Sequence, residues 1–184
     1  MTDLLACISV GGSRKWVWLA DTSGFSIRPC ARKGLAAFSL RRFEAGQIIL
    51  VEKPLARWYQ QVEHSREDNL AALHKCVSAL DSKSREKFDA LMQAPVHGKD
   101  RSVLGIFLSN SFACGEAVVG KQVVSSSLHT NFSRINHACR PNTQHLWHEE
   151  AGVRVLRAAR CIAPGDELTI AYTEEGVCDG RTAV

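Results

Sequence analysis

The spacing of hydrophobic positions divides the chain into three zones. In the first, residues 16–59, short apolar runs are separated by glycine, proline and polar residues. Runs of this length between turn residues are typical of β-strands, so this zone predicts an antiparallel sheet. The predicted strands are residues 16–19, 25–28, 35–38 and 47–51.

The middle zone, residues 62–114, has a helical period. Its apolar residues recur every three or four positions, which predicts amphipathic helices. Ser82 and Ser84 are N-cap candidates for the second helix, and Asp81 separates that helix from the first. A third helix is predicted over residues 100–112. The apolar faces of the first two helices are formed by Leu70, Leu73, Val77 and Leu80, and by Phe88, Leu91 and Met92.

Strand patterns return in the last zone, residues 123–172, with predicted strands at residues 153–158 and 167–172. Strands, then helices, then strands in so short a chain favour one sheet-based domain with a helical insertion. We therefore expect a mainly β fold of the α+β class, built from small antiparallel sheets with a helical insert. The helices then cap a sheet or shape a substrate cleft.

Composition narrows the class of protein. The 184 residues are 45% hydrophobic and 23% charged, which is typical of one globular domain. Seven cysteines are scattered without a CxxC pair, so we expect an intracellular protein of the nucleus or cytoplasm. No apolar stretch approaches the roughly 20 residues of a membrane span, so no membrane partner is expected. A net charge of +4 is too small to indicate direct nucleic-acid binding.

The densest cluster of chemically versatile side chains is residues 134–142, which read RINHACRPN. His137 and Cys139 stand two positions apart and no second pair at zinc spacing follows, so we predict no metal site. Nothing in the spacing indicates that a histidine meets the sulfur of Cys139. A small buried side chain is therefore a better interpretation of Cys139 than a nucleophile.

Asn136 has two interpretations. Its carboxamide carries both donors and an acceptor, and a turn held by Pro141 could present that group to a polar cofactor. The alternative is an Asx-turn, in which Asn136 satisfies its own backbone. The cluster by itself leaves both open.

Residues 134–142 resemble the NHSCxPN signature of SET-domain protein lysine methyltransferases, with Ala138 in place of the usual serine. Two more segments resemble motifs of this family and stand in the family's order. They are residues 33–46, KGLAAFSLRRFEAG, and residues 158–172, AARCIAPGDELTIAY. Residues 110–112, NSF, also resemble a segment of the SET and MYND subfamily, although no MYND zinc finger is present. The resemblance covers residues 25–173.

The resemblance implies a fold and a site. In the family, the segment that matches Asn136 and the final strand meet through a pseudoknot. Tyr172 matches the tyrosine at the methyl-transfer centre, and Phe112 and Ser133 match positions that border the channel for the target lysine. The implied cofactor is S-adenosylmethionine, held by Lys33, Gly34, Leu35, Ala36, Asn136, His137 and Tyr172.

The implied reaction transfers a methyl group to a lysine of a histone or non-histone protein. A neutral thioether leaves, so no general acid is required and alignment should dominate. The lysine must first lose a proton, and with a pKa near 10.4 this costs about 4.6 kcal/mol at pH 7. A narrow apolar channel lowers that cost by desolvating the ammonium.

Two departures from the family pattern define an alternative function. Ala36 replaces the second glycine of the first motif, which costs about 1–2 kcal/mol if that position needs a positive φ. The sequence also ends soon after Tyr172, without the cysteine-rich post-SET segment that closes the lysine channel in related enzymes. The alternative is a catalytically silent SET module that binds a protein partner.

The expected organisation is an N-terminal extension (1–24), a SET domain (25–173) with a helical insert (61–120), and a C-terminal tail (174–184).

Overall fold

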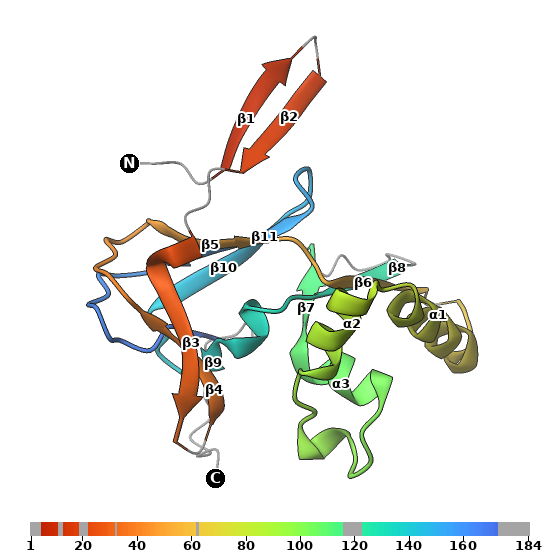
Figure 1. Cartoon of the computed structure of the whole chain (residues 1–184). Coiled ribbons are helices and arrows are strands. Elements are labelled where there is room, and N and C mark those ends of the chain that lie inside the picture. The colour runs from red at the N-terminus through yellow and green to blue at the C-terminus, as the bar shows by residue number, and fades with distance from the viewer. Residues whose placement is uncertain are drawn as a thin grey trace. The chain divides into compact units, whose positions relative to one another are not determined.

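The chain folds as two compact units, seen in a computed structural model (Figure 1). One unit comprises Met1–Glu52 and Arg134–Val184, and the other is Lys53–Ser133. The predicted helical insert, residues 61–120, lies within the second unit. The structure describes residues 5–10, 13–18, 22–31, 33–61, 63–115 and 123–172.

Two antiparallel hairpins begin the first unit. One joins β1 (Leu5–Val10) to β2 (Ser13–Trp18). A short 3-10 helix, Thr22–Gly24, precedes the second hairpin. That hairpin pairs β3 (Phe25–Cys30) with β4 (Gly34–Ser39) in an unbroken register.

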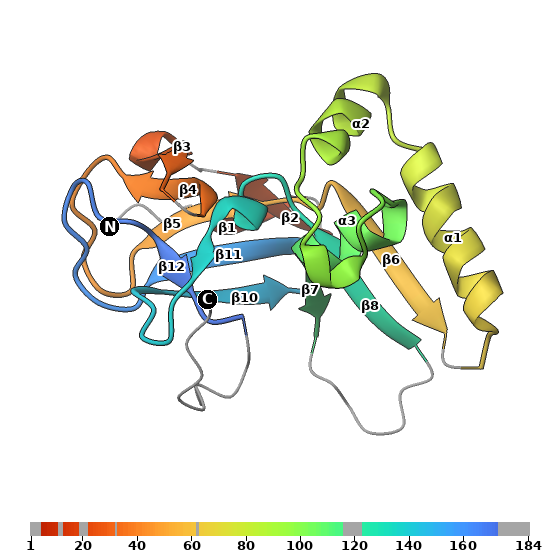
Figure 2. The same cartoon turned by 90° about the horizontal axis from the view of Figure 1, so that it is seen from below.

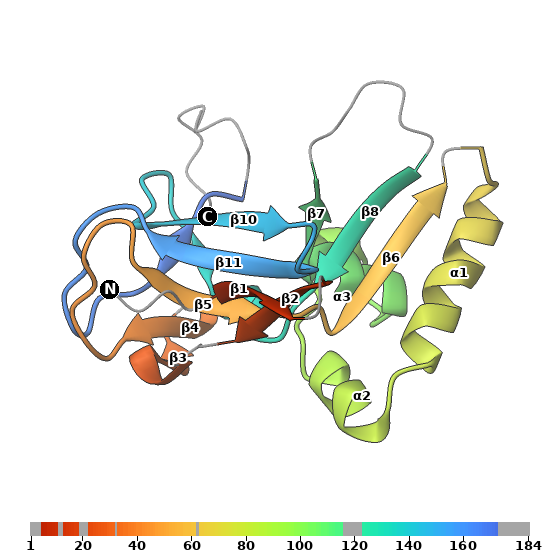
Figure 3. The ribbon, with the colours of Figure 1, turned by 90° about the horizontal axis from the view of Figure 1, so that it is seen from above.

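A three-stranded antiparallel sheet follows in the same unit, with the order β10-β11-β5 (Figure 3). Its strands are β5 (Ile48–Glu52), β10 (Thr143–His148) and β11 (Val153–Ala158). β5 reads IILVE, and its first four side chains are all buried, as expected of a continuous apolar run. The apolar cluster of this sheet contains Ile48, Val51, Val153 and Val155.

The fourth sheet element of this unit is parallel and very short. β9 (Asn136–His137) pairs with β12 (Thr169–Ile170). Asn142 stabilises the pairing, because its Oδ1 accepts from Thr169 N at 2.9 Å and its Nδ2 donates to Glu167 O at 2.9 Å. The two segments that the expected pseudoknot joins therefore lie side by side.

The second unit packs three helices on one antiparallel sheet with the order β6-β8-β7. α3 lies in front of the strands seen from below and behind them seen from above (Figures 2 and 3). The strands are β6 (Ala56–Gln61), β7 (Ser111–Cys114) and β8 (Val123–Leu128). The helices are α1 (Arg66–Ser78), α2 (Ser82–Asp89) and α3 (Val103–Asn110), with short 3-10 turns at Pro95–His97 and Phe132–Arg134.

Side-chain N-caps and a shared apolar core stabilise the three helices. The side chains of Ser65, Asp81 and Ser102 each accept a backbone N–H in the first turn of α1, α2 and α3. The rings of Trp58 on β6 and Phe107 on α3 meet edge to face, with centroids 5.5 Å apart. The core contains Ala56, Trp58, Leu73, Val77, Phe88, Leu91, Ile106, Phe107 and Leu128.

The structure confirms the mainly β class with three helices and corrects several details. The strands of residues 16–59 do not form one sheet. β3 and β4 pair only with each other, whereas β5 pairs with β11 and β6 with β8, which lie far along the chain. The N-cap of α2 is Asp81 rather than a serine. α3 ends at Asn110, since Ser111–Cys114 continues as β7. Met92 lies beyond the end of α2 and is 61% exposed, so its assignment to a buried face was wrong.

Candidate functional site

The turn between β3 and β4 carries the first predicted cofactor segment. Gly34 has a φ of +75°, a conformation that L side chains rarely adopt. Leu35 is partly exposed, whereas Ala36 is completely buried. Ala36 pairs with Arg28 in extended β4, so the conformational cost expected for alanine at this position does not arise.

Backbone hydrogen bonds hold β4 against the segment that leads into β12. Ser39 N donates to Asp166 O at 2.9 Å, and Leu168 N donates to Ala37 O at 2.8 Å. Phe38 and Glu167 form a bridge between these two contacts. The first predicted motif is therefore fixed beside the last one.

The Asn136 side chain joins these two segments. Its Nδ2 donates to Glu167 Oε1 at 2.8 Å and makes a longer contact of 3.4 Å to Leu35 O. Glu167 Oε2 accepts from Lys33 Nζ at 2.9 Å. Burial alone raises the pKa of Glu167, but the hydrogen bonds from Asn136 and Lys33 leave it below its usual value. Asn136 Nδ2 thus bonds across the site. The N–H of Ala138, which an Asx-turn would direct at Asn136 Oδ1, donates instead to Ile170 O at 3.0 Å, and this rules out the Asx-turn interpretation.

His137 and Tyr172 form the other half of the site. Tyr172 N donates to His137 Nδ1 at 3.1 Å, and the two ring centroids are 5.4 Å apart. The Tyr172 hydroxyl donates to Ile135 O at 3.1 Å. The residue as a whole is 62% exposed, although its hydroxyl bonds the backbone. Burial of this end, reinforced by the negative charge of Glu167, raises the pKa of Tyr172.

Phe112 and Ser133, the predicted channel residues, belong to the second unit. Phe112 packs against Phe132 and His129, with ring centroids 6.0 and 6.3 Å apart. Ser133 Oγ donates to Asn110 O at 3.2 Å and also to His129 O. The two residues therefore belong to one aromatic and polar cluster of that unit, and their role at a lysine channel stays a prediction.

Cys139 differs from its sequence-based interpretation. It is exposed and not buried, and it lies in a bend two residues past the end of β9. Its Sγ lies 3.5 Å from His137 Nε2. The predicted C-terminal tail, residues 174–184, lies outside the described residues.

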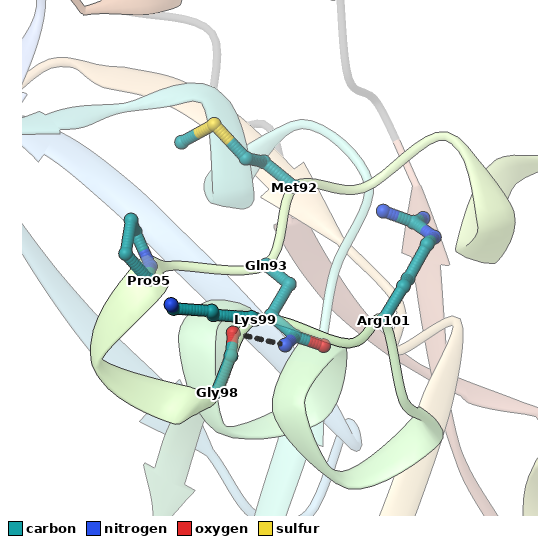
Figure 4. Close-up of a pocket in the computed structure, with 6 residues that line it drawn as sticks. All are labelled: Met92, Gln93, Pro95, Gly98, Lys99 and Arg101. Atoms are coloured by element: carbon teal, nitrogen blue, oxygen red, sulfur yellow. Dashed lines mark hydrogen bonds between the residues drawn. The ribbon is translucent and has the colours of Figure 1, made fainter.

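A separate pocket of about 360 Å³ lies in the second unit (Figure 4). Gln93 stands at its centre and donates from Nε2 to Gly98 O at 3.0 Å, which fixes the loop around it. None of the predicted site residues is among its described lining residues. They are Met92, Gln93, Pro95, Gly98, Lys99 and Arg101.

Sequence reasoning missed Glu167 as a residue of the site. The available signal was a charged side chain that directly precedes Leu168, Thr169 and Ile170, all of which are buried. A carboxylate in such a place requires partners. These partners could not be predicted from the local sequence, because Asn136 is 31 positions away from Glu167 and Lys33 is 134 positions away.

The comparisons with known proteins define the class of protein. A SET domain family model matches residues 34–173, most of the chain, and the chain belongs to this family. It is 25% identical over 155 residues to the histone-lysine N-methyltransferase set5 of Schizosaccharomyces pombe. The alignment covers 84% of this chain and 43% of that protein, so the chain spans less than half the length of this relative.

The chain is also similar to a crystal structure from Plasmodium falciparum, of a protein provisionally described as a histone methyltransferase. That match has a TM-score of 0.42 and 15% identity, and covers 82% of this chain and 94% of the other. Within the described residues, no helix is long and apolar enough to cross a membrane. The same residues contain no group of three or more His, Cys, Asp or Glu side chains placed to hold a metal ion.

Proposed function

We propose that this chain is an S-adenosylmethionine-dependent protein lysine N-methyltransferase. One observation supports the proposal above the others. Lys33, Asn136 and Glu167 are joined by hydrogen bonds of 2.8 and 2.9 Å, beside the contact of His137 with Tyr172. Segments separated by about a hundred residues thus converge in one unit, as a cofactor site requires.

The donors and acceptors of this site fit the proposed cofactor. S-adenosylmethionine supplies an electrophilic methyl group on a sulfonium, and its other end is an amino-acid zwitterion. Lys33 offers an ammonium, and Asn136 Oδ1 and the Glu167 carboxylate offer acceptors. The aromatic rings of His137 and Tyr172 favour a nearby positive centre. We assign cofactor binding to these residues and to the backbone of Gly34, Leu35 and Ala36.

Tyr172 is the proposed catalytic residue. Its raised pKa keeps the phenol protonated at neutral pH, so the side chain does not act as a base. The hydroxyl hydrogen is committed to Ile135 O at 3.1 Å, which leaves the oxygen lone pairs to accept an N–H from the substrate amine. His137 fixes the backbone of Tyr172 through the bond to its Nδ1. Tyr172 can therefore align the amine while a dehydrated channel lowers the cost of the neutral form.

The proposed substrate is a protein lysine, on a histone or on another protein. This follows from the family and from the name of the fission yeast relative. We propose Phe112 and Ser133 as the residues that border the lysine channel. Nucleus or cytoplasm is the proposed location.

The proposal is tested by calorimetric titration of S-adenosylmethionine into the purified chain. We expect saturable one-to-one binding, lost in Asn136→Ala and kept in Gln60→Ala. Gln60 is an exposed amide on β6 of the other unit, so it controls for loss of any amide. No binding to a chain that still unfolds cooperatively would contradict the proposal.

The silent SET module is distinguished by a second measurement on the same sample. Cofactor binding without methyl transfer to histones or to other basic proteins would favour it over the enzyme. Of the two reasons for that alternative, the one based on Ala36 is weakened, because Ala36 lies in an extended strand. The other reason, the expected lack of a post-SET segment, stays untested, because residues 173–184 lie outside those described.

A further inference from the structure

Glu167 occupies an unusual position for a carboxylate. Its side chain is 21% exposed and accepts two hydrogen bonds, from Asn136 Nδ2 to one oxygen and from Lys33 Nζ to the other. The backbone of Glu167 is also fixed, through the bridge to Phe38 and the 2.9 Å bond from Asn142 Nδ2 to its carbonyl. The position of the carboxylate is therefore fixed both by its two side-chain partners and by the contacts of its own backbone.

This contact determines which way the Asn136 carboxamide points. An ionised carboxylate can only accept hydrogen bonds, so the amide nitrogen and not the oxygen must face Glu167. The Leu35 carbonyl, 3.4 Å from the same nitrogen, imposes the same choice. No donor from the described part of the chain bonds to Asn136 Oδ1. The site therefore presents an acceptor at Asn136 and an ammonium at Lys33.

We propose that Glu167 is a positioning residue that holds Asn136 Oδ1 and Lys33 as a matched pair for an α-amino acid zwitterion. Asn136 Oδ1 accepts from the α-ammonium of the cofactor, and Lys33 pairs with its α-carboxylate. This inference rests on the proposed function, since it concerns the amino-acid end of the same cofactor. Glu167 therefore acts through the side chains of Asn136 and Lys33 and does not contact the reacting methyl group.

The charge pattern supports the amino-acid end over the other donors of the cofactor. Ribose hydroxyls and the adenine amino group are neutral and gain little from a neighbouring carboxylate. An ammonium gains from both Asn136 Oδ1 and the negative charge of Glu167 behind it. The Lys33 side chain is 45% exposed, so its ammonium can reach a ligand while it stays near Glu167.

The test compares Glu167→Gln with the wild type by calorimetry, using two probes. S-adenosylhomocysteine carries the amino-acid end, and 5′-methylthioadenosine lacks it. The glutamine introduced by the substitution can donate to Asn136 Oδ1. The Asn136 carboxamide can then rotate by 180° and no longer has to present its oxygen to the ligand. We expect affinity for S-adenosylhomocysteine to fall at least tenfold and affinity for 5′-methylthioadenosine to change less than twofold. Glu44→Gln removes another exposed ion pair of the same unit and should change neither.

A double substitution separates positioning from simple structural support. Combining Asn136→Asp with Glu167→Gln exchanges donor and acceptor, so an oxygen again remains for the α-ammonium. We expect the double variant to bind S-adenosylhomocysteine at least threefold more tightly than Glu167→Gln alone. Equal losses for both probes, or no recovery in the double variant, would overturn the inference while the proposed function stands. A wild-type chain that binds neither probe would overturn the proposed function itself.

Discussion

Tyr172 gives the sharpest prediction at the scale of single residues. Removing its hydroxyl in Tyr172→Phe removes the bond to Ile135 O and the lone pairs proposed to align the amine. A hydrogen bond of this kind contributes about 1–1.5 kcal/mol, so we expect methyl transfer to slow roughly tenfold or more. Transfer of a labelled methyl group measures the rate, and mass spectrometry of the product counts the groups added. Unchanged turnover and product pattern would remove Tyr172 from the mechanism.

His145 makes the stability of the fold depend on pH. Burial, followed by the charge of Arg154, lowers the pKa of His145 from 6.5 to about 4. Its Nδ1 lies 3.0 Å from Arg154 Nη1, which can donate only to a neutral ring. The unfolded chain binds this proton more readily than the folded one. Stability is therefore greatest above pH 6.5 and decreases as pH falls to about 4, by up to about 3 kcal/mol.

The measurement is urea unfolding between pH 7.5 and 4, compared with His145→Asn. Asparagine keeps an acceptor for Arg154 but does not titrate in this range. The difference between the two curves should vary with pH only between about 6.5 and 4. Parallel curves would show that His145 is as easily protonated in the folded state as in the unfolded state.

The sequence predicts some residues of the site and not others, for a physical reason. Lys33, Asn136, His137 and Tyr172 stand in motifs that are recognisable locally. The role of Glu167 arises from contacts 31 and 134 positions away, and no local pattern encodes them. Whether the motif residues bind cofactor stays a prediction.

At the scale of elements, the turn from β3 to β4 depends on Gly34. A Cβ added there meets no atom within 4 Å, so the cost of Gly34→Ala is the positive φ alone, about 1–2 kcal/mol. Gly46, at φ +85° and equally open, is a matched control outside the site. We expect similar losses of thermal stability in both alanine variants, and weaker cofactor binding only in Gly34→Ala. Equal affinity in the two would separate this turn from the cofactor.

Asn142 connects the short parallel strands β9 and β12. It bonds the backbone of Glu167 and Thr169, and is 7% exposed. Asn142→Ala leaves those groups buried without partners, so we expect a loss of about 2–4 kcal/mol in the free energy of unfolding. Asn142→Asp keeps the acceptor for Thr169 N but loses the donor to Glu167 O, and should lose less. Denaturant unfolding measures both, and equal small losses would contradict this role.

Local periodicity predicts which elements exist but not which elements pair. The helical spacing of Leu73 and Val77 locates α1, and both side chains are buried as predicted. The neighbour of β6 is β8, whose strand begins more than sixty residues later, and the sequence of β6 contains nothing that identifies it. The single sheet predicted for residues 16–59 failed in part for this reason, because β5 and β6 each pair with a distant strand.

At the scale of the whole molecule, each unit has its own apolar core. The core of the second unit is formed by β6, β8 and the three helices, and the β5 and β11 cluster belongs to the first. Phe107→Ala should therefore destabilise the second unit, by about 3–5 kcal/mol for a fully buried ring. Leu156→Ala, also fully buried, is the reciprocal change in the first unit.

Amide hydrogen exchange followed by mass spectrometry tests whether the two cores unfold as separate units. If the second unit can open by itself, Phe107→Ala speeds exchange mainly within residues 53–133, because the lost contacts all lie there. Leu156→Ala should speed exchange in the other unit. Uniform acceleration along the whole chain in both variants would show a single cooperative fold.

The residues proposed to bind cofactor, Lys33, Asn136 and Tyr172, all belong to the first unit. Cofactor should then slow exchange there and leave the effect of Phe107→Ala on the second unit unchanged.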